Sequence, residues 1–144
     1  MPEAEGKIID WLPETAIKKE WLESLPYEGE TQLVTYETEE FSAVCPFSGL
    51  PDLGRLQVSY VPAKRLVELK SLKYYLISFR QVGIYQENAT IRIFRDLWDL
   101  LHPRYLQIVL EYNLRGGIAA RCEKASASPH TLEKILYPTD HVSS

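Results

Sequence analysis

Two consecutive helix-like segments in the middle of the chain restrict its fold more than any other feature. Residues 63–80 contain neither Gly nor Pro, and their large apolar side chains recur at the spacing of one helix face: Leu69, Leu72, Leu76 and Phe79. Residues 87–101 repeat this spacing, and His102-Pro103 ends the run because a residue before proline avoids the helical region. The sequence therefore predicts two amphipathic helices, each with one side to bury.

Segments of alternating apolar and polar residues flank the two helices. Residues 31–36 and 55–61 precede them, and residues 105–112 and 117–122 follow, separated by the Arg115-Gly116-Gly117 turn. This order is typical of an α+β domain, β-β-α-α-β-β, whose antiparallel four-stranded sheet carries both helices on one face. Such a sheet has two unpaired edges that a second copy could cover, so we expect a homo-oligomer.

Length and composition fit one domain with a short N-terminal arm. The chain has 144 residues, of which 45% are hydrophobic, enough for one well-formed core. Residues 1–30 mix charges with Trp11, Trp21 and several leucines, a pattern that predicts an arm with one short helix, able to pack on a neighbouring copy. Residues 31–144 form the predicted domain.

Charge, hydropathy and cysteine content narrow the classes of partner. The formal net charge is -4, which disfavours direct nucleic-acid or acidic-membrane binding. No apolar run approaches the about 18 residues of a membrane span, and no signal peptide is evident, so we expect a soluble cytoplasmic protein. Cys45 and Cys122 are predicted to be free thiols, and neither they nor the three histidines show metal-ligand spacing.

The segment 45–52 places a cysteine near a carboxylate. Cys45 precedes Pro46, so its backbone is extended and lies outside any helix. Its thiol, with an ordinary pKa of about 8.5, needs a neighbouring group to take the proton before it can act as a nucleophile. Asp52 could take that proton and pass it to the attacked substrate, which suits addition to a multiple bond. The alternative is a buried structural cysteine, the commoner role in an apolar neighbourhood.

Charged residues near the starts of both helices have two interpretations each. Lys70 and Lys73 are three residues apart and share a helix face, either as an anion site or, more commonly, as a solvated surface. Glu87 either complements the positive end of the second helix or accepts two parallel hydrogen bonds from a guanine-like base. The chain has no glycine-rich phosphate loop, so a nucleotide would bind in another way.

Taken together, these clusters resemble the NADPH-dependent 7-cyano-7-deazaguanine reductases, the nitrile reductases of queuosine biosynthesis, in their short single-domain form. The resemblance runs in order through more than half the chain, and Glu68–Tyr75 is its specific signature. The other matching motifs are Cys45-Pro46 to Pro51-Asp52, Ser59-Tyr60 with Pro62, Ser78-Phe79-Arg80, Glu87, Pro103-Arg104-Tyr105 and Arg115-Gly116-Gly117.

The resemblance implies a tunnelling fold, in which subunits join their sheets into rings and two rings stack, here as a decamer. It also implies that Cys45 adds to the nitrile carbon to give a covalent thioimide while Asp52 protonates the nitrogen. Two NADPH molecules would then complete the reduction to the aminomethyl product. Glu87 would anchor the 7-deazaguanine base between subunits. The same pocket would contain Val67, Glu68, Leu69 and Gln86, and Lys70 and Lys73 would bind the phosphates of the cofactor.

One departure and two alternatives accompany this resemblance. Gln86 stands where the family often has histidine, so it can hydrogen-bond the base but cannot transfer a proton. The first alternative is the related archaeal amidine-forming enzyme, which acts on the same nitrile in tRNA and needs no hydride donor, although the acidic charge disfavours it. The second is a non-catalytic ring protein that binds a purine-like base through Glu87.

Overall fold

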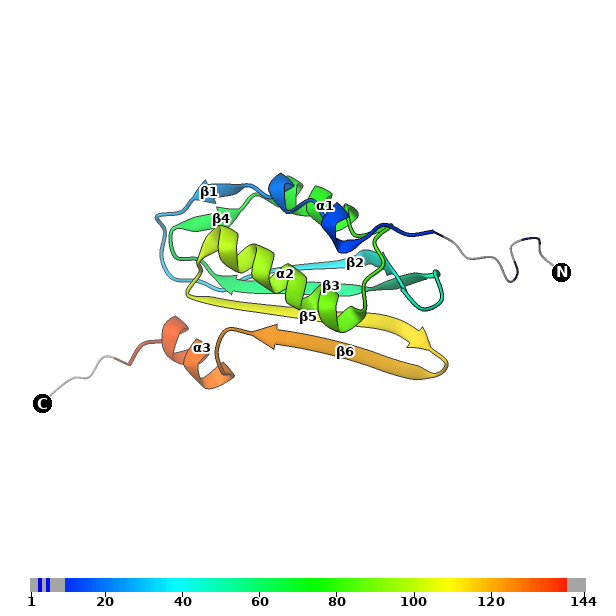
Figure 1. The fold of residues 1–144 in the computed structure, drawn as a ribbon. Helices are drawn as coiled ribbons and strands as arrows, with labels where there is room; N and C mark the ends of the chain where they lie inside the picture. Colours follow the sequence, from blue (N-terminus) through cyan, green and yellow to red (C-terminus); the bar gives the residue numbers. More distant parts are fainter. Residues whose placement is uncertain (1–2, 4, 6–9, 140–144) are drawn as a thin grey trace, which may run out of the picture.

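A computed structural model describes residues 3, 5 and 10–139 of the chain, which form an antiparallel sheet with two helices on one face (Figure 1). The four strands lie in the order β2-β3-β5-β6, and both helices follow β3 in the chain. This confirms the predicted α+β class. The four strands of this sheet and the two helices follow one another along the chain in the predicted series, but further elements precede, interrupt and follow that series. The elements are β2 (Val34–Val44), β3 (Pro51–Val61), α1 (Leu69–Ile77), α2 (Gln86–Leu101), β5 (Tyr105–Arg115) and β6 (Ile118–Ala125).

The four strands of the main sheet are longer than the alternation of residues predicts. β2 continues to Val44 and β3 begins at Pro51, so the loop between them spans only residues 45–50. Asp52 therefore lies inside β3, paired with Ala43 of β2, and not in the loop as predicted. The pairing fixes which face of the sheet the carboxylate occupies, because side chains alternate along a strand.

The prediction of a helix over residues 63–80 is wrong at both ends. Arg65–Val67 forms strand β4, which pairs with β1 (Ser24–Pro26) in a separate two-stranded sheet. The helix starts after Glu68, whose carboxylate accepts hydrogen bonds from the N–H groups of Lys70 (3.0 Å) and Ser71 (2.6 Å). This is an N-cap, which satisfies backbone donors that have no partner within the helix.

The described part of the segment 1–30 packs on the core of its own chain. It forms two short 3-10 helices, Glu14–Ala16 and Lys19–Trp21, and strand β1, where the sequence predicts one short helix. Ile17 and Leu22 are buried in the same apolar cluster as residues from both helices and the main sheet. A further helix that the sequence analysis missed, α3 (Pro129–Leu136), follows β6.

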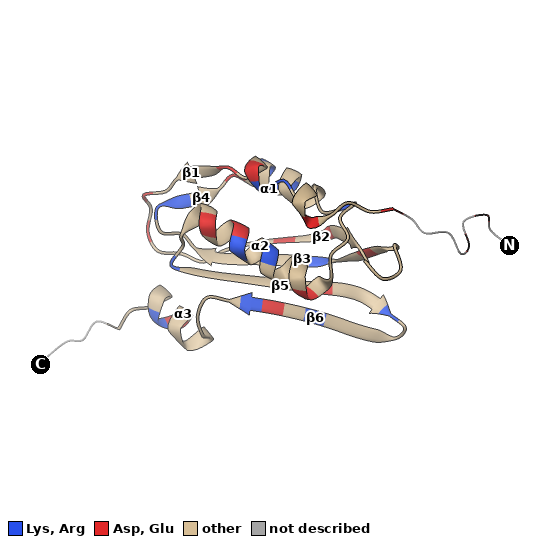
Figure 2. Ribbon diagram, viewed as in Figure 1, with Lys and Arg blue, Asp and Glu red and all other residues tan. Residues whose placement is uncertain are grey.

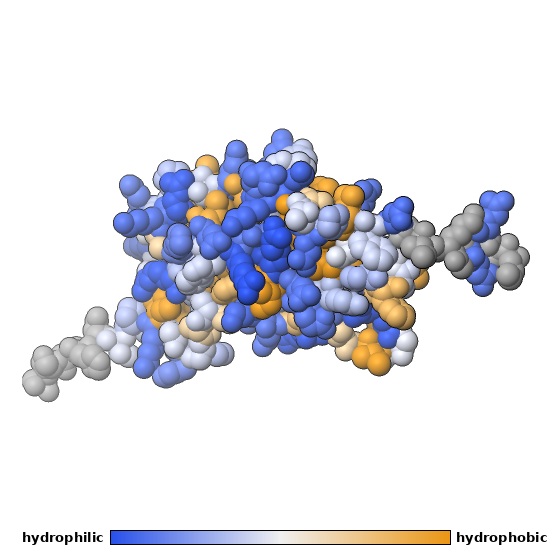
Figure 3. All heavy atoms as spheres, viewed as in Figure 1, coloured by the Kyte–Doolittle hydropathy of each residue, from blue (hydrophilic) through white to orange (hydrophobic). Residues whose placement is uncertain are grey.

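The surface is mixed in charge and partly apolar. Acidic and basic residues both occur along α2 (Figure 2). Hydrophilic residues cover the centre of the face shown in Figure 3, and hydrophobic residues gather toward the end that carries the β5–β6 hairpin. The exposed hydrophobic residues on the β2–β3 loop and this hairpin include Phe47, Leu50, Leu114 and Ile118. Within the described residues, we find no helix with the length and apolarity needed to cross a membrane.

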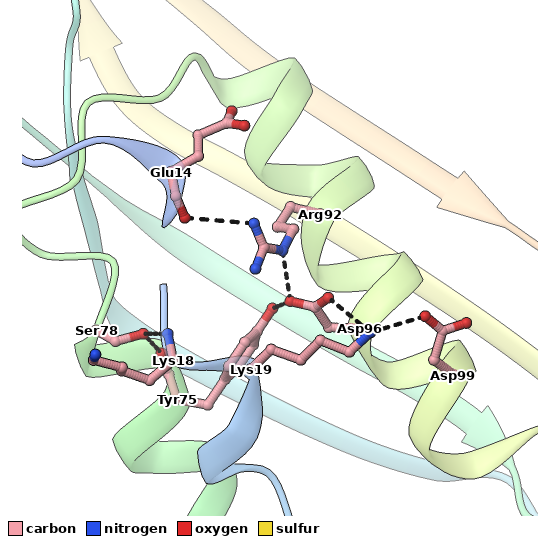
Figure 4. A network of polar contacts seen from close by, with 8 residues as sticks. All are labelled: Glu14, Lys18, Lys19, Tyr75, Ser78, Arg92, Asp96 and Asp99. Carbon is pink, nitrogen blue, oxygen red and sulfur yellow. Dashed lines mark hydrogen bonds and ion pairs between the residues drawn. The ribbon is translucent and has the colours of Figure 1, made fainter. Parts of the chain in front are cut away.

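A buried polar network joins the N-terminal segment to both helices (Figure 4). Asp96 on α2 is its centre: one carboxylate oxygen accepts hydrogen bonds from the Tyr75 hydroxyl (2.6 Å) and from Arg92 Nε (2.8 Å). Lys19 of the second 3-10 helix lies 3.9 Å from the other oxygen and 3.0 Å from the exposed Asp99. Burial, and then the charge of Asp96, raise the pKa of Tyr75, so its hydroxyl remains a donor at any ordinary pH.

Candidate functional site

Three segments that are distant in sequence meet at one end of the molecule (Figure 1). They are the β2–β3 loop, the start of α2 and the β5–β6 hairpin. The loop is closed by two backbone hydrogen bonds, from Cys45 N–H to the carbonyl of Leu50 (2.9 Å) and from Gly49 N–H to that of Cys45 (2.8 Å). Gly49 has a φ of 73°, a left-handed conformation that favours glycine. The loop thereby holds the half-buried Cys45 at a defined place.

The surroundings of the Cys45 sulfur favour its thiolate. Burial raises the pKa of the thiol, but the Ser48 hydroxyl and the backbone N–H groups of Ser48 and Phe47 donate hydrogen bonds that together lower it. The charge of Asp52 opposes them and raises the pKa. The resulting pKa of the Cys45 thiol lies below its ordinary value, because hydrogen bonds to the thiolate stabilise the charged form. The sequence pattern predicts Asp52 as a proton acceptor for this thiol, but it does not indicate the donors in the loop.

Asp52 is buried and forms an ion pair with an arginine from the neighbouring strand. Only 8% of Asp52 is exposed, and its Oδ1 lies 3.3 Å from Nη1 of Arg115 at the end of β5. The other guanidinium nitrogen of Arg115, Nη2, donates to Oε1 of Gln86 (3.1 Å). Arg115 thus joins Asp52 to Gln86, and the charge of Asp52 acts on the Cys45 thiol. The sequence contains no local signal for this role of Arg115, because the contact spans 63 residues.

Gln86 and Glu87 stand at the start of α2 but face different surroundings. Gln86 is only 3% exposed, and its Nε2 donates to the carbonyls of Leu110 (2.9 Å) and Ala120 (3.0 Å) on β5 and β6. Glu87 is exposed in the first turn of the helix. Its carboxylate is therefore available to a ligand, whereas the amide of Gln86 is already engaged with the protein.

The second cysteine, Cys122, lies on β6, where it feels the charge of Glu87. Burial raises the pKa of the Cys122 thiol, and the charge of Glu87 raises it further, outweighing the Thr90 hydroxyl and Arg115 that lower it. The two thiols of the chain are thus shifted in opposite directions by their surroundings. A raised pKa disfavours the thiolate, and so disfavours a nucleophilic role for Cys122.

We expect Cys45 to be alkylated faster than Cys122 at neutral pH, because the thiolate is the reactive form. Its pKa is lowered and that of Cys122 raised, so half-maximal reaction with iodoacetamide should occur at a lower pH for Cys45. Peptide mass spectrometry across a pH series measures both sites in one sample. Ser48→Ala should move the Cys45 midpoint upward and leave Cys122 unchanged. The reverse order of reactivity would show that the loop donors do not act on Cys45.

The remaining predicted site residues lie at the start of α1. Val67 is buried, Glu68 caps the helix, and Leu69 is half exposed. Lys70 and Lys73 are exposed on successive turns and line neighbouring pockets. One pocket, of about 550 Å³, is lined by Trp21, Glu68, Lys70 and Tyr74 among others; the other, of about 260 Å³, is lined by Tyr36, Leu69, Lys73 and Leu76 among others. Neither pocket includes Cys45, Asp52 or Glu87.

The site residues therefore fall into two groups within one chain. We name Cys45, Asp52, Gln86, Glu87 and Arg115 the cysteine group, and Val67, Glu68, Leu69, Lys70 and Lys73 the helix group. Among the residues that the structure describes, no cluster of three or more His, Cys, Asp or Glu side chains is arranged to hold a metal ion.

Comparisons with known proteins identify the family. The family model described as "QueF-like protein" matches residues 51–131. A protein of Thermotoga petrophila named NADPH-dependent 7-cyano-7-deazaguanine reductase is 50% identical over 127 residues, which cover 88% of this chain and 93% of the relative. A protein of the same name from Thermoanaerobacter pseudethanolicus is 55% identical over 107 residues, which cover 73% of this chain and 80% of that protein.

A solved structure supports the fold. The crystal structure of the archaeosine synthase QueF-Like in the apo form matches with a TM-score of 0.65 at 20% sequence identity, and covers 70% of this chain and 100% of that one. The match confirms the predicted α+β tunnelling fold. The range matched by the family model contains Asp52, Gln86, Glu87 and Arg115. The chain belongs to the QueF-like protein family.

Proposed function

We propose that this protein is a cytoplasmic NADPH-dependent reductase that converts the nitrile of 7-cyano-7-deazaguanine to an aminomethyl group. This reaction belongs to the biosynthesis of queuosine, a modified nucleoside of tRNA. The names of relatives that are 50% and 55% identical support this activity. The observation that carries the proposal is the place of Cys45: a half-buried thiol in the β2–β3 loop, whose pKa is lowered by Ser48 and Phe47 and which feels the charge of the buried Asp52 carboxylate. This pair can add a nucleophile to a nitrile and deliver a proton to its nitrogen.

The proposed chemistry begins with a proton transfer from the Cys45 thiol to the Asp52 carboxylate. The thiolate attacks the nitrile carbon, a C–S bond forms, and one π bond of the nitrile breaks toward nitrogen. The carboxylic acid of Asp52 then returns the proton to that nitrogen, which leaves a neutral covalent thioimide and the original carboxylate. The adjacent Arg115 balances the negative charge of Asp52 before and after the transfer.

The helix group suits the phosphates of a dinucleotide cofactor. Lys70 and Lys73 are exposed on one side of α1, and neither forms an ion pair with any residue that the structure describes. Unpaired ammonium groups are good partners for phosphate oxygens. When bound, NADPH supplies hydride, and a nitrile needs two such equivalents to become an amine because the change takes four electrons. Release of the Cys45 thiolate follows the first reduction.

The division into two groups favours a site shared between copies of the chain. Substrate recognition would combine Glu87 of one copy, holding the base edge with its exposed carboxylate, with Val67, Glu68 and Leu69 of another. Strands β2 and β6 are the edge strands of the main sheet, and exposed apolar residues lie on the loop and hairpin near the cysteine group. Both features support joined sheets and stacked rings, with a decamer as the expected assembly. Light scattering that gave the mass of a single chain would contradict this assembly.

The test of function is NADPH oxidation by the purified protein with free 7-cyano-7-deazaguanine, followed by absorbance and by mass spectrometry of the base. We expect two NADPH consumed for each aminomethyl product. If the folded protein consumes none, nitrile-modified tRNA with an amine donor tests the amidine-forming alternative. Binding of the base with no turnover of either substrate would favour a non-catalytic protein.

A further inference from the structure

Arg115 is the centre of an arrangement of four residues, itself, Asp52, Gln86 and Tyr112. Its Nη1 binds Asp52 and its Nη2 binds Gln86, so one planar guanidinium bridges a strand and a helix. The guanidinium carbon also lies 5.0 Å from the centre of the Tyr112 ring. Arginine suits this position because its flat, rigid group can donate at one edge while its face stacks on an aromatic ring.

The Tyr112 ring is itself held from below. It stacks on Phe41 of β2, with ring centres 6.4 Å apart, and lies directly over Gly54 of β3. A Cβ at Gly54 would come within 2.6 Å of Cδ1 of Tyr112, so a side chain there would push the ring outward. The Tyr112 ring on which Arg115 stacks is therefore part of the packed core.

Gln86 holds the guanidinium from above, and its own orientation is fixed. Both hydrogens of its amide nitrogen are directed at backbone carbonyls, those of Leu110 and Ala120. The amide oxygen must then face Arg115, because the reverse orientation would set oxygen against two carbonyl oxygens. All the polar atoms of this buried side chain are engaged with the protein.

We infer that Gln86 is a positioning residue that acts through Arg115 to hold the Asp52 carboxylate beside Cys45, and that it does not contact the substrate. The expected effect of Gln86 on the reaction rests on the proposed function. Its expected effect on the Cys45 thiol rests only on the contacts described above. It differs from the role in base recognition that the family resemblance implies for residue 86. The two roles give different experimental results.

The electrostatic consequence follows from the charged groups around Cys45. The charge of Asp52 on β3 raises the pKa of Cys45, and Arg115 at the end of β5 forms an ion pair with Asp52. Glu87 on α2 raises the pKa of Cys122 and is not among the groups that shift Cys45. When Arg115 is not held against Asp52, the carboxylate charge is less balanced. A nearby unbalanced carboxylate disfavours the thiolate. The pH at which Cys45 becomes reactive therefore reports on the contact between Arg115 and Asp52.

The test compares Gln86→Met with Arg115→Met in a Cys122→Ala background, so that Cys45 is the only thiol. Arg115→Met removes the guanidinium that joins Asp52 to Gln86. Because Arg115 lies at an exposed hairpin, this variant still tests the inference if the buried change Gln86→Met prevents folding. We expect both variants to move the midpoint of Cys45 alkylation to higher pH. The matched control is Arg121→Met, which removes an equally charged, exposed arginine that pairs with Glu111 and Glu123; the Cys45 midpoint of this variant should not move.

Kinetics with 7-cyano-7-deazaguanine separate positioning from substrate contact. Positioning predicts about a ten-fold loss of kcat in both variants with unchanged affinity for the base, and a double variant no worse than Arg115→Met alone. A weaker affinity with an unmoved alkylation midpoint would overturn the inference in favour of substrate contact. Loss of thermal stability with neither change would show a purely structural role. A wild type without reductase activity would defeat the proposed function, while the alkylation midpoints would still decide the inference.

Discussion

Replacing Cys45 by alanine is expected to abolish reduction of 7-cyano-7-deazaguanine, with a loss of kcat/KM of roughly a thousand-fold or more. Cys45 is the only thiol of the cysteine group, and removal of a covalent nucleophile typically costs several orders of magnitude. The measurement is steady-state NADPH oxidation, together with intact-mass analysis of the wild type mixed with substrate but no NADPH. The wild type should gain the mass of one 7-cyano-7-deazaguanine molecule, because the thioimide forms without a reductant. Cys45→Ala should show no such mass increase.

Two control variants make this result specific. Cys122→Ala removes the other thiol, which lies beside Glu87 and has a raised pKa, and it should keep activity close to that of the wild type. Asp52→Asn keeps the size of the side chain but cannot accept the thiol proton, so adduct formation should be slow while base binding remains. If Cys45→Ala retained turnover within about ten-fold of the wild type, the covalent mechanism would be wrong even though the reductase activity stood.

Removing the carboxylate of Asp96 should cause the largest loss of stability among single changes outside the sheet core. Asp96→Ala leaves the buried Tyr75 hydroxyl without its acceptor and Arg92 without its ion-pair partner. Breaking a buried pair by deleting one partner typically costs about 3–5 kcal/mol. The measurement is urea-induced unfolding at one fixed protein concentration, since the stability of an oligomer depends on concentration.

The same network supplies matched controls for Asp96→Ala. Asp99→Ala removes an exposed carboxylate that pairs with the same Lys19, and should change stability by less than about 1 kcal/mol. Tyr75→Phe added to Asp96→Ala removes the unsatisfied hydroxyl and should restore part of the loss. A cost for Asp96→Ala no larger than that for Asp99→Ala would mean that the network is not a significant source of stability.

Periodicity predicted the main sheet and its two helices because these elements bury one face and expose the other. It failed at residues 63–68, where the side chains tolerate a helix but the backbone of Arg65–Val67 pairs with β1. Strand β1 lies about 40 residues earlier in the chain, and no local sequence pattern predicts its pairing with β4. The helix α3 did carry a local signal, since Ser128 precedes Pro129 and accepts a hydrogen bond from Thr131 N–H, a common helix start that the analysis overlooked.

The candidate site divides in the same way between local and distant information. Cys45 and Asp52 are conspicuous because few residue types can carry this chemistry, and the family resemblance added Glu87. Arg115 could not be assigned a role, because its contact with Asp52 depends on the register of β3 against β5 and on a bulge between Tyr112 and Arg115. The engagement of Gln86 with Leu110 and Ala120 likewise depends on how α2 is placed over β5 and β6.

The extent of the core also sets a lower limit on any fragment of this protein that could be studied alone. The family model matches residues 51–131, yet Phe41, Leu22 and Ile17 belong to the same buried cluster as residues inside that range. A fragment cut to the matched range would lack β2 and Cys45, and would expose the long edge of β3 to solvent. The range matched by the family model is therefore smaller than the unit that we expect to fold, and the proposed nucleophile lies outside that range.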